Sequence, residues 1–519
     1  MDTSQPSNQT IQIPRWINNA ILIAGALVLC GSVWFSVLRN LDFPWTSIRL
    51  APAFALTQGY PLYSLPDRPP WVMVGYGPLY PVMYLPATLA GTPVTAVTVA
   101  TLFAHLYILV PVGLLCVACA GRLRQQLAPS QLHWSLILFF FALVAYTVPS
   151  LNYVTTHVHV DAPALGFFLF AAYSVLRAQF DSRNYVRWIL VAGACVGLSA
   201  ACKINLAIAA LGFFLWLIRF LGAKRALTFL AASVLTFCVI YACAGLRDGF
   251  APLLLNLTLP GRMPWFTYNE LGTLSLSGSS HEFIDKFRTF LTFASSYLRD
   301  YGIVTLALFL LLPTLEQKSA SATQLIKFFL FLALVMVLVS IVSVSKSGGD
   351  VNSRALVSLP LALAAVFAFA ILLQSASRTA LLASQATGIA LIFIVALATV
   401  SGLLRFSLKG RATLTEAYQV VSTGASRWYF PFDPLAHLLA EKKFRPNMDV
   451  VHSYAAASAP VDKEAFRAAL PENLEYIAIP PAFVSWGADE ILRLVPGYNR
   501  VVREPQLENH QVIGRSSGP

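Results

Sequence analysis

Charge is scarce in this 519-residue sequence, in which only 12% of the residues are Asp, Glu, Lys or Arg. Soluble domains carry about twice that share, roughly one residue in four. By contrast, 57% of the residues are hydrophobic, and the mean hydropathy is +0.66. This composition excludes an ordinary soluble protein and indicates an integral membrane protein.

Signatures of several other protein classes are also missing. All seven cysteines lie in predicted membrane spans, including Cys116 and Cys119, so they indicate neither a disulfide framework nor a zinc or redox motif. The pair Gly348 and Gly349 lacks the spacing of a phosphate-binding loop, so no nucleotide cofactor is expected. No internal repeat is visible, which argues against the repeated architecture of many transporters.

The basic residues are spread over short loops between apolar runs, although the net charge is +12. Short basic loops of polytopic proteins face the cytoplasm, so we expect the lipid bilayer as a partner and no nucleic acid. The alternate loops, among them residues 39–92 and 247–300, are longer and richer in aromatic and acidic residues. The sequence therefore predicts a multi-pass protein of the inner or plasma membrane that functions on its extracytoplasmic (periplasmic) face.

Hydropathy predicts about eleven transmembrane helices, some of them shorter than the roughly 20 residues that cross a hydrocarbon core. The first apolar run is too long for a signal-peptide core and is expected to remain as an anchor. The approximate spans are 17–38, 93–120, 133–149, 162–177, 188–202, 204–219, 226–246, 301–313, 327–345, 355–374 and 380–403.

The composition changes at about residue 405, where charged and polar residues become frequent. Strand-like and helix-like segments alternate in this tail, which predicts a small soluble α/β domain over residues 405–519 on the extracytoplasmic side. Residues 1–404 form the predicted transmembrane domain. Its first outer loop, residues 39–92, is rich in proline and aromatic residues and is expected to lie on the membrane surface as short amphipathic pieces.

Asp42 directly follows the first apolar run, in the stretch RNLDFPW. Among Phe43, Pro44 and Trp45 at a membrane face, its carboxylate would be partly desolvated, which makes it a better general base. The alternative is a solvated acid at the end of an anchor helix.

A second polar constellation is NYVTTHVHVDAP. Pro163 belongs in a first helical turn, which predicts that a helix begins near Asp161 after an extended segment. In an extended chain His157, His159 and Asp161 would share one face, where they could bind a divalent metal or a phosphate. Alternatively, Asp161 caps the helix and the histidines are interfacial polar residues.

Three further segments carry cations. Lys203 stands between two apolar segments, where a lysine marks a functional site unless it snorkels to the outer end of a hairpin. The loop KSGGDVNSR holds Lys346, Asn352 and Arg354, which could offer cations and backbone amides to a phosphate or form an ordinary polar turn. Arg262, in PGRMPWFTYNE, is predicted to line the same cavity.

The order of these parts resembles the GT-C glycosyltransferases, multi-spanning enzymes that use polyprenyl-phosphate sugars. The resemblance covers most of residues 15–403 and is carried by Asp42, APAFALTQGYPLY, YGPLYPVMYLP, GACVGLSAACKINLAI and KSGGDVNSRALVSLPLALAA. It implies a GT-C-like fold, Asp42 as base and Asp161 as a second acid, with Tyr76 of YGPLY assigned to substrate binding. The family's Asp-x-Asp or Glu-x-Asp is His-x-His-x-Asp here, so a divalent metal at His157, His159 and Asp161 stays an open alternative.

These observations predict a membrane glycosyltransferase that moves a hexosyl or pentosyl group from a polyprenyl-phosphate donor to a hydroxyl of a glycan, lipid or protein acceptor. A single displacement with Asp42 as base would invert the anomeric centre, while Lys203, Lys346 or Arg354 stabilises the departing lipid phosphate. The alternatives are a transporter or flippase of lipid-linked saccharides and a non-catalytic membrane subunit.

Overall fold

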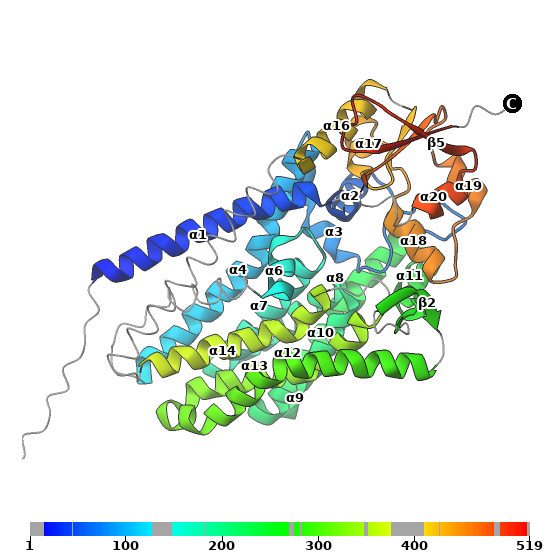
Figure 1. Ribbon diagram of the computed structural model, residues 1–519. Coiled ribbons are helices and arrows are strands. Elements are labelled where there is room, and N and C mark those ends of the chain that lie inside the picture. Colours follow the sequence, from blue (N-terminus) through cyan, green and yellow to red (C-terminus); the bar gives the residue numbers. More distant parts are fainter. Residues whose placement is uncertain are drawn as a thin grey trace, which may run out of the picture.

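A computed structural model gives the fold of residues 15–43, 45–126, 148–181, 183–268, 274–280, 283–346, 351–374, 409–424, 426–481 and 488–515. Long helices form one elongated bundle in these ranges, and the segments after residue 409 gather at one end of it (Figure 1). The helices of the bundle are α1 (Arg15–Asp42), α4 (Pro93–Gln126), α6 (Pro149–Thr156), α7 (Asp161–Phe180), α8 (Tyr185–Cys202), α9 (Ala209–Leu221), α10 (Ala223–Asp248), α12 (Phe283–Lys318), α13 (Ala320–Val344) and α14 (Ala355–Gln374).

Shorter elements connect these helices. They are α2 (Trp45–Thr57), α3 (Leu79–Met83), η1 (Leu85–Leu89), η2 (Ile204–Ile208), α11 (Phe250–Arg262), β1 (Trp265–Tyr268), β2 (Leu274–Ser280) and η3 (Val351–Arg354). The tail consists of α16 (Lys409–Thr423), β3 (Trp428–Tyr429), α17 (Pro434–Ala440), α18 (Met448–Ala456), α19 (Lys463–Ala468), β4 (Tyr476–Ile479), α20 (Ala488–Leu494), β5 (Tyr498–Val502) and β6 (Gln511–Arg515).

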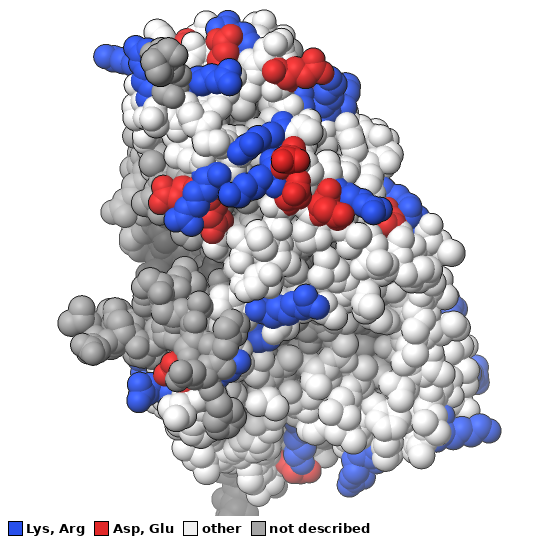
Figure 2. Space-filling model, turned by 90° about the vertical axis from the view of Figure 1, so that its right-hand side faces the viewer, with Lys and Arg blue, Asp and Glu red and all other residues white. Residues whose placement is uncertain are grey.

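Seven helices among the described residues are long and apolar enough to cross a membrane, and α6 with α7 would add an eighth as a broken span. Their outward surfaces are apolar: Leu235 is 66% exposed, Leu306 60% and Leu338 63%. In Figure 2 charged side chains gather toward the tail end and toward the opposite end, with few in the broad area between. This arrangement fits a bilayer around the bundle.

The bounds of some predicted spans differ from those of the helices. Those at 133–149 and 380–403 lie almost wholly outside the described residues. The segment at 301–313 was predicted too short, because α12 already begins at Phe283. Its first part carries Asp285 and other charged residues, so hydropathy alone does not report it as part of the same helix.

The bundle is interrupted between α6 and α7, which meet at an angle of 103°. His157 is extended there (φ −93°, ψ 146°), and Val160 has already turned into the helical region (φ −59°, ψ −26°). The predicted start of the helix at Asp161 is confirmed. Because no regular helix runs through residues 157–160, polar side chains can point inward at this break.

Much of the first outer loop is buried. In α2 nine residues are buried, among them Leu50 and Phe54, and Tyr63 and Trp71 farther along are each 1% exposed. Trp71 belongs to one apolar core with Phe432 and other tail residues. α2 therefore packs between the bundle and the tail, and its position at the membrane surface stays a prediction.

The tail contains a four-stranded sheet in the order β3-β4-β6-β5. β3 and β4 are parallel, whereas β6 runs antiparallel to β4 and β5, with Ile477 opposite Ile513. Phe466 of α19 and Tyr429 of β3 are fully buried in the core that also includes the first outer loop. Tail and loop are thus packed as one unit.

A buried polar contact joins α2 to the tail. Ser47 Oγ donates a hydrogen bond to Asp433 Oδ1 at 2.5 Å and accepts one from the backbone N–H of Leu435 at 3.1 Å. Asp433 is only 5% exposed. Burial raises its pKa to about 7, although the Ser47 hydrogen bond acts in the opposite direction.

This carboxyl predicts a pH-dependent stability of the tail. In the unfolded chain Asp433 titrates near pH 4, so between about pH 4 and pH 7 only the folded state keeps its proton. Stability should therefore fall as the pH rises through this window. We expect the purified protein to unfold at a lower temperature at pH 8 than at pH 5.5, and Asp433→Asn to reduce this difference. An unchanged pH slope in the variant would contradict the prediction.

Candidate active site

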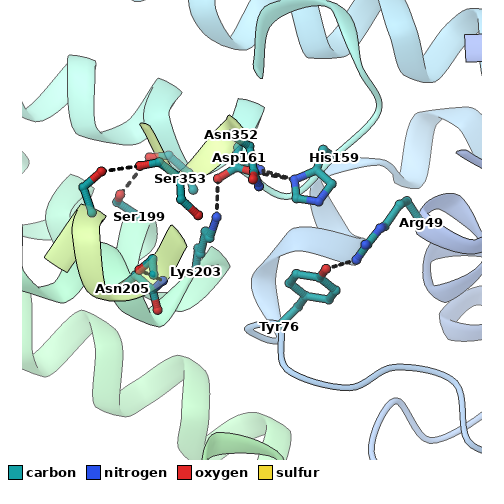
Figure 3. Close-up of polar contacts among 12 residues, drawn as sticks. Arg49, Tyr76, His159, Asp161, Ser199, Lys203, Asn205, Asn352 and Ser353 are labelled. Atoms are coloured by element: carbon teal, nitrogen blue, oxygen red, sulfur yellow. Dashed lines mark hydrogen bonds and ion pairs between the residues drawn. The ribbon is translucent and has the colours of Figure 1, made fainter. Parts of the chain in front are cut away.

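Asp161 is the centre of a buried polar cluster formed by three separate segments (Figure 3). The residue is 1% exposed and lies in the first turn of α7. Its Oδ1 accepts a hydrogen bond from Lys203 Nζ at 2.6 Å, and its Oδ2 accepts one from Asn352 Nδ2 at 2.7 Å. The Nδ1 atom of His159 also contacts Oδ2. Residues from the α6–α7 break, the end of α8 and η3 thus meet at one carboxylate.

A carboxylate buried this deeply requires compensation, because the desolvation of an isolated ion is very costly. The Lys203 ammonium supplies a full positive charge, the Asn352 amide a hydrogen bond, and the start of α7 a favourable helix dipole. In return, Asp161 holds the Lys203 side chain, which is 11% exposed. The lysine therefore points into the protein instead of snorkelling outward.

The backbone next to Lys203 is fixed by the first outer loop. Lys203 directly follows α8 with an extended backbone (φ −143°, ψ 110°), and the N–H of Gly77 donates to the carbonyl oxygen of Cys202 at 2.9 Å. A Cβ at position 77 would lie 2.0 Å from the carbonyl oxygen of Ala201, so only glycine permits this approach. The YGPLY segment thereby lies directly against the end of α8.

Opposite Lys203, Arg49 of α2 and Tyr76 face His159 (Figure 3). The Arg49 guanidinium donates to the Tyr76 hydroxyl and lies 4.7 Å from the Tyr76 ring centroid and 5.6 Å from that of Trp45. The Tyr76 ring meets the His159 ring edge-on at 5.9 Å. A second cation and an aromatic wall therefore stand beside the Asp161 cluster.

The end of α1 is pinned to the same region. Asn40 donates to the carbonyl oxygen of Thr156 at 2.6 Å and accepts from the N–H of Val158 at 3.3 Å. Arg39 donates to Asn152 Oδ1 at 2.8 Å. Asp42, the last residue of α1, therefore has its backbone beside the α6–α7 break, whereas its side chain lies outside the described part of the structure.

Of the predicted group His157, His159 and Asp161, His159 contacts Asp161 through its Nδ1 atom, but His157 does not join them. His157 stacks on Tyr153 at 4.3 Å, and its Nδ1 contacts the Tyr153 carbonyl oxygen at 3.1 Å. Within the described ranges, no group of three His, Cys, Asp or Glu residues is placed to hold a metal ion. The donors at Asp161 do not fit a dication, because an ammonium already occupies Oδ1.

The other predicted cations lie elsewhere. Arg354 pairs with Asp300 of α12 at 2.6 Å. Lys346 donates to the carbonyl oxygen of Pro260 at 3.3 Å, and burial, with Lys286 nearby, lowers its pKa. Arg262 is exposed. Of the KSGGDVNSR loop, in the part that the structure describes, it is Asn352 that reaches Asp161.

Three residues of this region were missed in the sequence: Asn40, Arg49 and Tyr153. Arg49 carried a usable signal, since it is a single charge within the largely apolar stretch TSIRLAPAFAL and resembles Lys203 in that respect. Nothing in the sequence distinguishes Asn40 or Tyr153 from other polar and aromatic residues at the end of a membrane helix.

Fold and cluster together define a polytopic helical membrane protein with a buried charged site at one end of its bundle. No family model matches the sequence, and no curated protein matches it. Among solved structures, the chain is similar to ArnT from Cupriavidus metallidurans, both bound to undecaprenyl phosphate and in the apo state. Identity is 13% in each case over 96% of this chain, with 99% and 98% of those chains covered and TM-scores of 0.43 and 0.44.

Proposed function

We propose that the protein is a membrane glycosyltransferase that transfers a sugar from a polyprenyl-phosphate donor to an acceptor hydroxyl on the extracytoplasmic side. The observation that carries this proposal is the meeting of Asp161, Lys203 and Asn352 beside the end of α1, where Asp42 stands. A base carried by the end of α1 and a buried cation in the neighbouring cluster would suit a reaction in which an anionic lipid departs.

The reaction would proceed as a single displacement. Asp42 accepts the proton of the acceptor hydroxyl, whose oxygen attacks the anomeric carbon of the donor. The bond between that carbon and the phosphate oxygen breaks, and polyprenyl phosphate leaves with the electron pair. One displacement inverts the anomeric centre.

Lys203 is assigned to the departing phosphate. Its ammonium is held at 2.6 Å from Asp161 Oδ1, so it is charged and oriented before the donor arrives. Asp161, with both oxygens engaged by Lys203 and Asn352, acts in this scheme by holding the lysine instead of taking the acceptor proton.

The location of the cluster suits a lipid-linked donor. Lys203 lies where α8 ends, Asn352 where α14 is about to begin, and Asp161 at the break before α7. A polyprenyl chain stays in the bilayer, so its phosphate and sugar reach the protein near such helix ends. The short basic loops support an extracytoplasmic location for this end of the bundle.

The test is a transfer assay with purified protein in lipid nanodiscs. Polyprenyl-phosphate hexoses and pentoses are supplied with glycan, lipid and peptide acceptors, and release of polyprenyl phosphate is followed by mass spectrometry. We expect release with one donor, an inverted glycosidic bond in the product, and no loss of rate with a chelator, because the Lys203 ammonium occupies the Asp161 site. Translocation of a lipid-linked saccharide across vesicles without release would favour a flippase instead.

A further inference from the structure

The tail reaches the candidate active site through one charged side chain. Asp449 of α18 forms an ion pair with Arg49 of α2, with 3.4 Å between Asp449 Oδ2 and Arg49 Nη1. Their side chains are only 18% and 14% exposed. An ion pair shielded to this degree is screened less by solvent than a surface pair.

Arg49 is confined on several sides. Its guanidinium lies near the rings of Trp45 and Tyr76, and its Nη1 atom contacts both Asp449 Oδ2 and the Tyr76 hydroxyl. Arginine suits such a place because its planar group can stack on aromatic rings while it donates at its edge. The direction in which Arg49 points therefore depends on Asp449.

Tyr76 is held separately at its backbone and at its ring. Its carbonyl oxygen accepts from the Tyr63 hydroxyl at 2.9 Å and from Asn256 Nδ2 at 3.3 Å, and the N–H of Gly77 is bonded to Cys202. These contacts fix the backbone. Its ring packs edge-on against both Tyr80 and His159, and its phenol oxygen accepts a hydrogen bond from Arg49.

The tail is attached firmly enough to serve as an anchor for Arg49. Asn447, two residues before Asp449, donates to the carbonyl oxygen of Val72 at 3.3 Å. Tyr454, also in α18, donates to the carbonyl oxygen of Ser64 at 2.7 Å. α18 is therefore bound to the loop that carries Tyr76 on both sides of Asp449.

We propose that Asp449 is a positioning residue of the active site: it orients Arg49, and through Arg49 it sets the Tyr76 ring against His159, next to Asp161. The effect on transfer rests on the proposed function, whereas the mechanical link does not. The tail is thus part of the site and not only a cover for it.

The first experiment is a double-mutant cycle on sugar transfer with Asp449→Asn and Tyr76→Phe. These two residues act on each other through Arg49, so their effects should not multiply. We expect each single variant to lower kcat/KM by about tenfold or more, since small displacements of positioning groups have large effects on rate. The double variant should be no worse than the more severe single one. Independent, multiplying effects would overturn the proposal.

Two further variants separate positioning from folding. Asp449→Glu keeps the negative charge, so its kcat/KM should lie within about threefold of the wild-type value. Arg49→Lys keeps the ion pair but lacks the planar guanidinium group, so its kcat/KM should fall as in Asp449→Asn. The matched control is Glu475→Gln, which removes a half-exposed tail carboxylate paired with Arg427 at 2.5 Å. It should leave transfer unchanged.

A readout without substrate tests the link itself. 3-Fluorotyrosine is placed at position 76, and its fluorine NMR resonance reports the surroundings of the ring that contacts Arg49 and His159. The resonance should shift in Asp449→Asn and keep its wild-type position in Glu475→Gln. An unchanged resonance in Asp449→Asn refutes the link. A shifted resonance, with a wild-type protein that transfers no sugar, would uphold the link and refute the proposed function.

Discussion

Exchange of Asp42 for asparagine is expected to slow sugar transfer by about 10²–10⁴-fold, the usual contribution of a general base. Asparagine has nearly the same shape but cannot accept the proton of the acceptor hydroxyl. The end of α1 should keep its place, because Asn40 and Arg39 fix it through contacts with Thr156 and Asn152. Donor affinity should therefore stay within a few-fold of wild type. The measurement is single-turnover transfer together with a donor-binding titration on the same sample.

Asp67→Asn is the matched control for this experiment. Asp67 lies in the same outer loop but is exposed, next to Arg68 at 3.6 Å, so its exchange should change neither rate nor affinity. A full transfer rate in the Asp42 variant would remove the assigned base and with it the proposed mechanism. If the variant loses donor affinity but keeps its transfer rate, Asp42 belongs to the donor site instead.

Replacement of Asp161 by asparagine should produce the largest loss of stability. The Lys203 ammonium would remain mostly buried without its counter-charge, and breaking a buried ion pair in this way costs about 3–5 kcal/mol. Transfer should be lost as well, because the lysine would no longer be held near the leaving phosphate. Thermal unfolding of the purified variant and its yield in the membrane fraction measure the first effect.

A second variant separates the two roles of this pair. In Asp161→Asn combined with Lys203→Met, neither partner is left as an unpaired charge, so most of the lost stability should return. Transfer should stay at background level, because the cation is absent. A double variant that is stable and also active would show that the pair is structural and that the leaving phosphate is stabilised elsewhere.

Much of the site was visible in the sequence because charge is so rare in an apolar chain. Asp161 and Lys203 stand out for this reason, whereas Asn352 was selected as part of the polar loop KSGGDVNSR. Pro163 correctly predicted where α7 begins. Their pairing could not be predicted, because 42 and 191 residues separate Lys203 and Asn352 from Asp161. Such distant contacts depend on how the helices pack, which hydropathy does not specify.

Other contacts in the structure differ from the predicted ones for identifiable physical reasons. The alternation rule for His157, His159 and Asp161 holds in an extended chain, but the backbone is extended at His157 and already helical at Val160. Arg354 looked like a phosphate ligand, yet it pairs with Asp300 on α12, a helix whose first part hydropathy did not report. The burial of α2 could not be predicted from its own sequence, because it depends on the tail, which follows α2 by several hundred residues.

The core shared by the first outer loop and the tail has a consequence for biosynthesis. Trp71 and Ile48 are synthesised several hundred residues before Phe432 and Met448, with which they form one apolar cluster. Until the tail has been synthesised, these early apolar side chains stay uncovered. The site would thus mature only after the tail has folded onto the loop, and chains that stop before α16 would offer proteases and chaperones an unfinished outer surface.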